Sequence, residues 1–78
     1  MSTLSVSNIA KQITVTDLLK KFNKIGKCTV SLKGSHALIE FSQEKDAIEA
    51  IRFFNDKELG GQKLTVTFTI KKDLKSQY

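Results

Sequence analysis

The fold of this 78-residue chain is decided by the stretch Lys33-Gly34-Ser35-His36-Ala37-Leu38-Ile39-Glu40-Phe41. From Ala37 onward the residues alternate, so that Ala37, Ile39 and Phe41 fall on one side of an extended chain. His36, Leu38 and Glu40 fall on the other side. A period of two indicates a β-strand with one buried face. The small, β-branched and aromatic residues of that face suit packing beneath helices.

Three other stretches alternate in the same way and are predicted to be strands: residues 4–9, 29–33 and 64–69. The turn sequence Lys33-Gly34-Ser35 joins residues 29–33 to the next strand, so we expect a short hairpin with almost no loop. A Gly60-Gly61 pair turns the chain before the last strand.

Two stretches have helical spacing instead. The first is predicted to begin after a Thr14 cap and to end at Gly26 in the C′ position. The second is predicted to be capped by Ser42 and to end at Asn55-Asp56. Apolar residues recurring three and four positions apart predict the buried sides of both helices. These residues are Leu18, Leu19, Phe22 and Ile25 in the first helix, and Ala47, Ala50 or Ile51, and Phe54 in the second.

The resulting order is strand, helix, strand, strand, helix, strand. This order predicts an α+β fold of the ferredoxin-like, split βαβ type (βαββαβ). Both helices should cover one face of a four-stranded antiparallel sheet. The other face of the sheet should then be free of helices.

The opening stretch resembles the longer RNP motif of the RNA recognition motif (RRM) family, K/R-G-F/Y-G/A-F-V-x-F/Y. Matching Lys33-Gly34 to the start of the motif would put Glu40 at its last, buried aromatic position. A lone buried carboxylate costs several kcal/mol. We therefore shift the match by one residue, which puts Phe41 at that position. His36 and Leu38 then stand where the family has its base-stacking aromatics.

Residues 4–9 resemble the family's shorter RNP motif, an aliphatic-aromatic-aliphatic-x-Asn-aliphatic run. Leu4, Val6, Asn8 and Ile9 match, whereas Ser5 stands in place of the stacking aromatic. The resemblance extends over residues 3–70. We expect one domain over residues 1–78, with its core at about 3–70 and a basic tail at 71–78. It is identified as an atypical RRM that lacks the usual stacking aromatics.

The resemblance implies that the helix-free face of the sheet binds RNA. Strand alternation places mainly small polar residues on that face: Ser5, Ser7, Thr29, Ser31, Lys33, His36, Leu38, Glu40, Lys63, Thr65, Thr67 and Thr69. All six aromatic residues of the chain fall elsewhere by this pattern. The candidate RNA-binding residues are Ser5, Ser7, Lys33, His36, Leu38, Lys63, Lys71 and Lys72.

Each candidate also has an ordinary explanation that involves no ligand. His36 also fits a surface histidine among small polar neighbours, and Leu38 fits a single exposed apolar residue of the kind that most proteins have. Serines and threonines are common on solvent-facing strands. On the first helix, Lys20, Lys21 and Lys24 form either a second RNA surface or a solvated helix face.

Charge is spread unevenly along the chain, whose net charge is +5. Residues 11–33 carry six lysines and one aspartate, and residues 59–78 carry four lysines and one aspartate. Residues 40–58 carry six acidic and three basic side chains. A dipolar, basic domain suits a polyanion on one side and a protein partner on the other. The alternative is that the uneven charge distribution arose by chance and that these charged side chains contact only solvent.

The sequence lacks the residues that several other functions on this fold require. An acylphosphatase on this type of fold needs an arginine in a phosphate-cradling loop, but the only arginine, Arg52, falls in the second helix. A metallochaperone needs a C-x-x-C pair, and Cys28 is the only cysteine. We expect no enzyme activity, cofactor, metal site or small-molecule substrate.

One RRM class binds tryptophan-containing peptides through an acidic first helix and an R-x-F motif after the second helix. Here the matching place reads Lys57-Glu58-Leu59 and the first helix is basic. Both departures disfavour that mode of binding and leave other protein-binding modes open.

The chain has no run of 18 apolar residues, so no membrane partner is expected. A single cysteine favours a reducing compartment. We expect an intracellular protein, and the sequence does not distinguish nucleus from cytoplasm. The predicted function is weak binding of RNA, single-stranded or structured, within a larger protein or complex. The RNA should contact the sheet face and the lysines at its edges, Lys33, Lys63, Lys71 and Lys72. The alternative is a protein–protein interaction module on the same fold.

Overall fold

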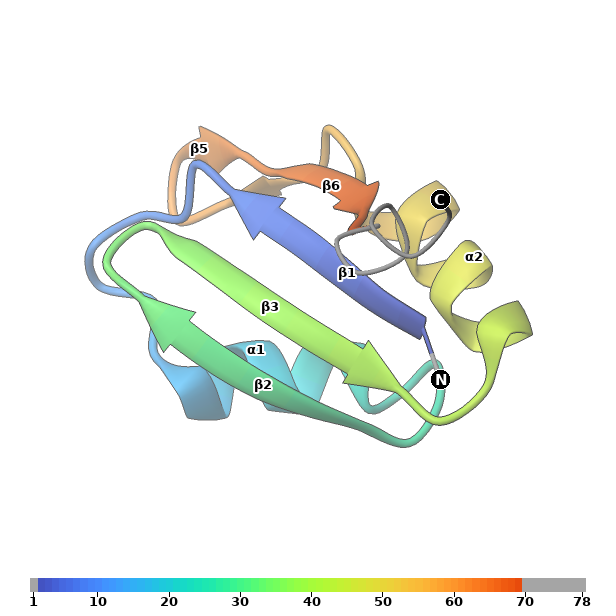
Figure 1. The fold of residues 1–78 in the computed structure, drawn as a ribbon. Helices are drawn as coiled ribbons and strands as arrows, with labels where there is room; N and C mark the ends of the chain where they lie inside the picture. Colours follow the sequence, from blue (N-terminus) through green and yellow to red (C-terminus); the bar gives the residue numbers. More distant parts are fainter. Residues whose placement is uncertain (1, 70–78) are drawn as a thin grey trace, which may run out of the picture.

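The computed structural model describes residues 2–69 and contains two helices and six strands in that range. Four strands form an antiparallel sheet in the order β2-β3-β1-β6, and both helices cover one of its faces (Figure 1). The predicted α+β ferredoxin-like fold is confirmed. The elements are β1 (Ser2–Ser7), α1 (Val15–Phe22), β2 (Cys28–Lys33), β3 (His36–Phe41), α2 (Glu44–Phe54), β4 (Glu58–Leu59), β5 (Gln62–Lys63) and β6 (Thr65–Phe68).

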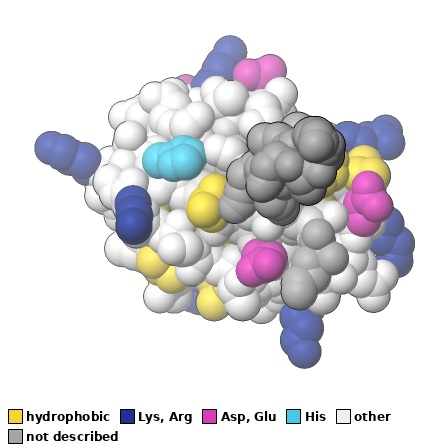
Figure 2. All heavy atoms as spheres, viewed as in Figure 1, with side chains coloured by type: hydrophobic (Ala, Val, Ile, Leu, Met, Phe, Trp, Pro, Cys, Tyr) yellow, Lys and Arg dark blue, Asp and Glu magenta, His cyan; other side chains and the backbone are white. Residues whose placement is uncertain are grey.

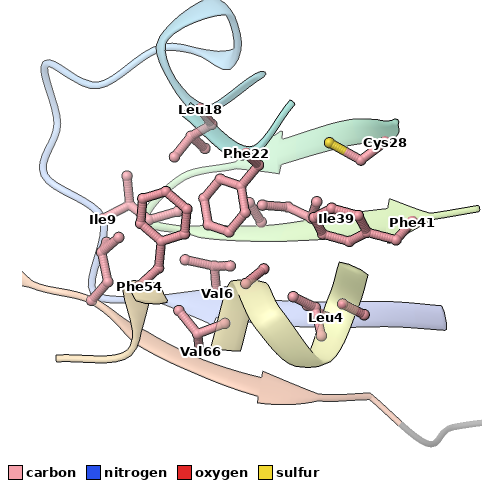
Figure 3. Close-up of a cluster of buried hydrophobic side chains, with 14 residues drawn as sticks. Leu4, Val6, Ile9, Leu18, Phe22, Cys28, Ile39, Phe41, Phe54 and Val66 are labelled. Carbon is pink, nitrogen blue, oxygen red and sulfur yellow. The ribbon is translucent and has the colours of Figure 1, made fainter. Parts of the chain in front are cut away.

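Burial confirms the register predicted for β3. Ala37, Ile39 and Phe41 are each at most 1% exposed, whereas Glu40 is exposed on the opposite face. The neighbouring strand β1 alternates in phase with β3, because its buried residues Leu4 and Val6 lie opposite the buried residues Ile39 and Ala37. Figure 3 shows the resulting core, which includes Leu4, Val6, Ile9, Leu18, Phe22, Cys28, Ile39, Phe41, Phe54 and Val66.

Three phenylalanines connect the two helices to the sheet. The ring of Phe22 on α1 stacks on the ring of Phe54 on α2, with 4.2 Å between their centroids. The centroid of Phe22 also lies 6.5 Å from that of Phe41 on β3, at a tilted angle. Aromatic pairs in these arrangements contribute about 0.5–1.5 kcal/mol beyond the area they bury. The rings therefore fix both helices against the same face.

The predicted start of α1 is confirmed, but its predicted end is wrong. Thr14 and Asp17 form a capping box in which each side chain accepts a hydrogen bond from the other residue's backbone N–H. The helix ends at Phe22, so Gly26 is not its C′ residue. Gly26 instead lies against the side chain of Asp46, which occupies the space that a Cβ would need. Tertiary packing, and not the helix end, accounts for this glycine.

The predicted cap of α2 is also wrong. Ser42 prolongs the pairing of β3 with the start of β2, because its backbone N–H donates to the carbonyl of Lys27 at 3.2 Å. Its hydroxyl points to the same carbonyl, at 3.5 Å. The helix therefore begins later, with Gln43 as an N-cap that makes no side-chain hydrogen bond. The predicted end is confirmed, since α2 stops at Phe54 and Asn55 is its C-cap.

The segment between α2 and β6 forms a small hairpin of β4 and β5, which the sequence did not predict. Gly60 and Gly61 make its turn with φ angles of 64° and 86°, a left-handed conformation that suits two-residue hairpin loops. Two backbone hydrogen bonds hold the base of the hairpin, from the N–H of Asp56 to the carbonyl of Leu64 and from the N–H of Leu64 to the carbonyl of Lys57. The hairpin thereby packs beside the end of α2.

Candidate nucleic-acid interface

The face of the sheet opposite the helices is mostly polar. Figure 2 shows this face, on which the single histidine lies among atoms that are mostly neither charged nor hydrophobic. Charged side chains project mainly at the edges of this view. No phenylalanine of residues 2–69 is placed on this face by strand pairing, and the core holds Phe22, Phe41 and Phe54. Within residues 2–69, this face therefore lacks the phenylalanine and tyrosine rings on which bases stack in this kind of fold, and His36 supplies its one ring.

Ser5, His36 and Leu38 form a central cluster on that face. Ser5 lies on β1 directly opposite Leu38 on β3. Its hydroxyl oxygen is 2.8 Å from Nε2 of His36, two residues before Leu38 on the same strand. Leu38 is 38% exposed, and His36 is exposed. The two strands thus bring a hydroxyl, an imidazole and an apolar side chain together at the three positions where the sequence match placed stacking aromatics.

The hydrogen bond orients the imidazole of His36. A serine hydroxyl donates to the unprotonated nitrogen of a neutral ring or accepts from a protonated one, so the contact persists in either tautomer. One ring nitrogen is occupied in this way. The ring faces remain the part of His36 suited to stacking on a base.

The remaining described candidates lie at one end of the sheet. Lys33 is directly opposite His36 at the tip of the β2–β3 hairpin. Ser7 is the last residue of β1 and pairs with Thr65, the first residue of β6. Lys63, the last residue of β5, lies two residues before Thr65 and is exposed. We call Lys33 and Lys63 the basic rim, because these two lysines flank the hairpin end of the central strands.

The backbone at Lys63 is held in place by Asn8. Asn8 adopts a left-handed φ of 65° just after β1, and its side-chain amide donates to the carbonyl of Lys63 at 2.8 Å. The side chain of Gln62 donates in turn to the backbone carbonyl of Asn8 at 3.0 Å. The sequence prediction did not assign these roles, because the partners are 54 or 55 residues apart. The only local signal was the asparagine of the shorter motif.

The sequence candidates Lys71 and Lys72 lie outside the described residues, as does Tyr78. Among the lysines of α1, Lys20 and Lys21 follow the buried Leu18 and are exposed. They belong to the helical layer and not to the central cluster.

Two titratable groups outside this face have shifted pKa values. Hydrogen bonds from the backbone and side chain of Thr14 lower the pKa of Asp17. Burial raises the pKa of the thiol of Cys28, the first residue of β2. A raised pKa leaves less of the reactive thiolate at neutral pH.

A model of the RNA recognition motif family matches residues 4–65 of this chain. The chain belongs to the RNA recognition motif family. The match includes β1, β3 and both helices, and therefore both RNP-like stretches. Membership of this family supports the predicted class of function, an RNA-binding module.

Solved structures with the same fold include "Pes4 RRM3", which is 25% identical with a TM-score of 0.82 over 94% of this chain and 96% of that one. The RRM3 domain of Gbp2 is also 25% identical, with a TM-score of 0.81 over 87% of this chain and 75% of that one. The RNA recognition domains 1 and 2 of Sex-lethal from Drosophila melanogaster are 23% identical, with a TM-score of 0.85 over 90% of this chain and 50% of that one. No curated protein matches this chain.

Neither helix within residues 2–69 is long and apolar enough to cross a membrane. The same residues contain no group of three or more His, Cys, Asp or Glu side chains placed to hold a metal ion.

Proposed function

We propose that this chain binds single-stranded RNA through the helix-free face of its sheet. The observation that carries the proposal is the central cluster of Ser5, His36 and Leu38, which lie together on two adjacent strands. The sequence match assigns these three residues to the base-stacking positions of the family. In this proposal the ring of His36 stacks on one base and Leu38 packs beside it. Ser5 and Ser7 offer hydroxyl groups to bases or phosphates.

The basic rim supplies the phosphate contacts in this proposal. Lys33 and Lys63 are exposed at the same end of the central strands, where a backbone crossing the sheet would pass. Lys71 and Lys72 follow β6 in the sequence and are proposed as further phosphate contacts on sequence grounds alone. Contacts from lysine to phosphate are independent of base sequence.

We further propose that binding is weak. Each base–aromatic stack is worth about 1–3 kcal/mol. With Ser5 and Leu38 at two of the three stacking positions, the module should bind RNA about 2–6 kcal/mol less tightly than one with a full set of rings. A module of this affinity gains from being linked to other RNA contacts in the same protein or complex.

The test is a titration of the ¹⁵N-labelled domain with short mixed-sequence RNA oligomers, followed by amide chemical shifts. The proposal expects the largest changes at Ser5, His36 and Leu38, with smaller ones at Lys33 and Lys63. Changes confined to the helices would contradict it. The absence of any change at millimolar RNA would do so as well.

A further inference from the structure

A second candidate surface lies in the helical layer, away from the central cluster. It is a hollow of about 590 Å³ between the end of α1, the last turns of α2 and the β4–β5 hairpin. Its lining includes the apolar side chains of Ile25, Leu59 and Leu64. Hollows of roughly 300–1,000 Å³ are large enough to bury a small ligand or a few side chains. Because the helices cover the opposite face of the sheet, occupation of this hollow leaves the central cluster open.

Phe53 is one of the residues that line this hollow, and its side chain is unusually exposed for a large apolar residue. The buried stripe of α2 consists of Ala47, Ala50 and Phe54, and Phe53 lies beside that stripe with 55% of its surface exposed. Its ring is held edge-on against Phe54, with 5.0 Å between centroids. Aromatic residues, phenylalanine included, are enriched in protein–protein interfaces relative to the rest of the protein surface.

The charges around the hollow are unequal. It is lined by Lys21 of α1, by Lys24 two residues after that helix and by Lys57 after α2, together with two carboxylates, Glu49 and Glu58. The ammonium group of Lys57 also lies 4.4 Å from the centroid of the Phe53 ring. Positive charge therefore exceeds negative charge at the hollow, as it does over the whole chain, whose net charge is +5. An acidic partner would be attracted to this surface.

The same lining favours a peptide over RNA. A phosphate backbone would meet the carboxylates of Glu49 and Glu58 and would leave the apolar walls without a partner. A peptide has an apolar side chain for the walls, and its backbone N–H groups can donate to these two carboxylates. Its own acidic side chains can pair with Lys21, Lys24 and Lys57.

We propose that this hollow is the docking site for a short acidic segment of a protein partner. One large apolar side chain of that segment enters between Ile25 and Leu59 and packs against Phe53. Flanking aspartates or glutamates pair with the lysines of the hollow. The interaction is separate from RNA binding, so the domain holds both ligands at once on opposite faces.

The experiment uses a short synthetic peptide with one phenylalanine flanked on both sides by aspartates and glutamates. This peptide is titrated into the ¹⁵N-labelled full chain, with and without RNA. Amide shifts are expected at Ile25, Phe53 and Leu59 but not at His36. Phe53→Ala should lower the affinity for the peptide about tenfold, as expected for loss of an aromatic residue at an interface centre.

Two matched controls separate the hollow from general effects. Ile48→Ala removes an apolar side chain of α2 that is 43% exposed and lies outside the hollow, and it should leave peptide affinity unchanged. Lys24→Glu should lower the affinity for the peptide, whereas Lys20→Glu in α1, outside the hollow, should lower it less. The lysine pair tests the proposal even if Phe53→Ala fails to fold.

Several results would overturn the proposal. One is the absence of peptide-induced shifts in the hollow. Another is equal binding of a peptide in which the acidic residues are replaced by lysines. Shifts at Ile25, Phe53 and Leu59 on adding RNA but not peptide would assign the hollow to nucleic acid. None of these results bears on the central cluster, which the RNA titration tests independently.

Discussion

Ser5 Oγ and His36 Nε2 lie 2.8 Å apart, although the two residues are 31 positions apart in the sequence. The antiparallel pairing of β1 with β3 produces this contact, since it places Ser5 opposite Leu38, two residues beyond His36. The contact joins two positions that the sequence match assigns to stacking rings of the family. One hydrogen-bonded imidazole stands there, and it is the only ring on the helix-free face among residues 2–69. If this face binds RNA as proposed, most of the affinity should come from charge.

The first prediction is a steep dependence of RNA affinity on salt. Each lysine that contacts a phosphate releases counterions, so the logarithm of the association constant should fall linearly with the logarithm of the salt concentration. Replacing Lys33 or Lys63 by glutamine should lower the magnitude of this slope by about one unit each. Measurements of RNA binding between about 50 and 200 mM salt give the slope.

The control for this prediction is Lys45→Gln, which removes an exposed lysine from α2 on the other side of the sheet. It should leave the slope nearly unchanged if the basic rim is the site. Clear binding with a flat slope would show that the electrostatic account is wrong.

The second prediction concerns the stability of the core. Phe41 is 0% exposed and lies near Phe22, so Phe41→Ala should lower the free energy of unfolding by about 3–5 kcal/mol. Chemical denaturation of the two proteins measures the difference. Phe53→Ala is the matched control, because Phe53 is 55% exposed and its loss should cost much less. Equal losses for the two variants would contradict the burial argument.

The third prediction concerns the pH dependence of stability through Asp17. Hydrogen bonds from Thr14 lower the pKa of Asp17 in the folded protein below 3.8, the ordinary value for an aspartate. The ionised carboxylate therefore stabilises the folded state above the unfolded-state pKa, and this contribution is lost as the pH falls through the folded-state pKa. Asp17→Asn should accordingly be less stable than the parent at neutral pH. The difference should shrink toward zero at acid pH.

Thermal unfolding of the parent and Asp17→Asn from neutral to acid pH measures this difference. Asp56→Asn is a suitable control, since Asp56 is exposed outside both helices and makes no side-chain cap. A difference between parent and Asp17→Asn that is constant across the whole pH range would rule out the capping carboxylate as its cause.

The fold could be predicted because alternation is a strong local signal. Moving β3 by one residue would have buried Glu40 in place of Phe41, so the sequence alone selected the correct face. The helix boundaries at Gly26 and Ser42 were predicted less well. Both residues are typical of helix ends, but here they serve contacts with Asp46 and Lys27 that are distant in the sequence.

The candidate site was likewise predicted in part. The position of Ser5 and Leu38 on the helix-free face followed from strand parity and was predicted. The Ser5–His36 hydrogen bond and the attachment of Asn8 to Lys63 were not, because each depends on how one strand pairs with another. The hollow beside Phe53 depends on the β4–β5 hairpin, which carries only a Gly60-Gly61 signal in the sequence.

The last prediction is a gain of RNA affinity from restored rings. Ser5→Phe and Leu38→Phe place aromatic side chains at two directly opposed positions on the helix-free face, and neither side chain enters the core. Folding should therefore survive. Each ring should add about 1–3 kcal/mol of stacking with single-stranded RNA. The double variant should bind much more tightly than the parent with little change in salt slope, because stacking releases few counterions.

Binding of single-stranded RNA to the parent and the double variant, measured by fluorescence anisotropy at two salt concentrations, tests this prediction. Lys45→Phe adds a ring to an exposed position of α2 and controls for non-specific binding of RNA to exposed rings. It should not raise affinity. If the double variant folds and binds RNA no more tightly than the parent, the helix-free face is not an RNA surface. The basic first helix or a protein partner would then become the leading explanation of this domain's function.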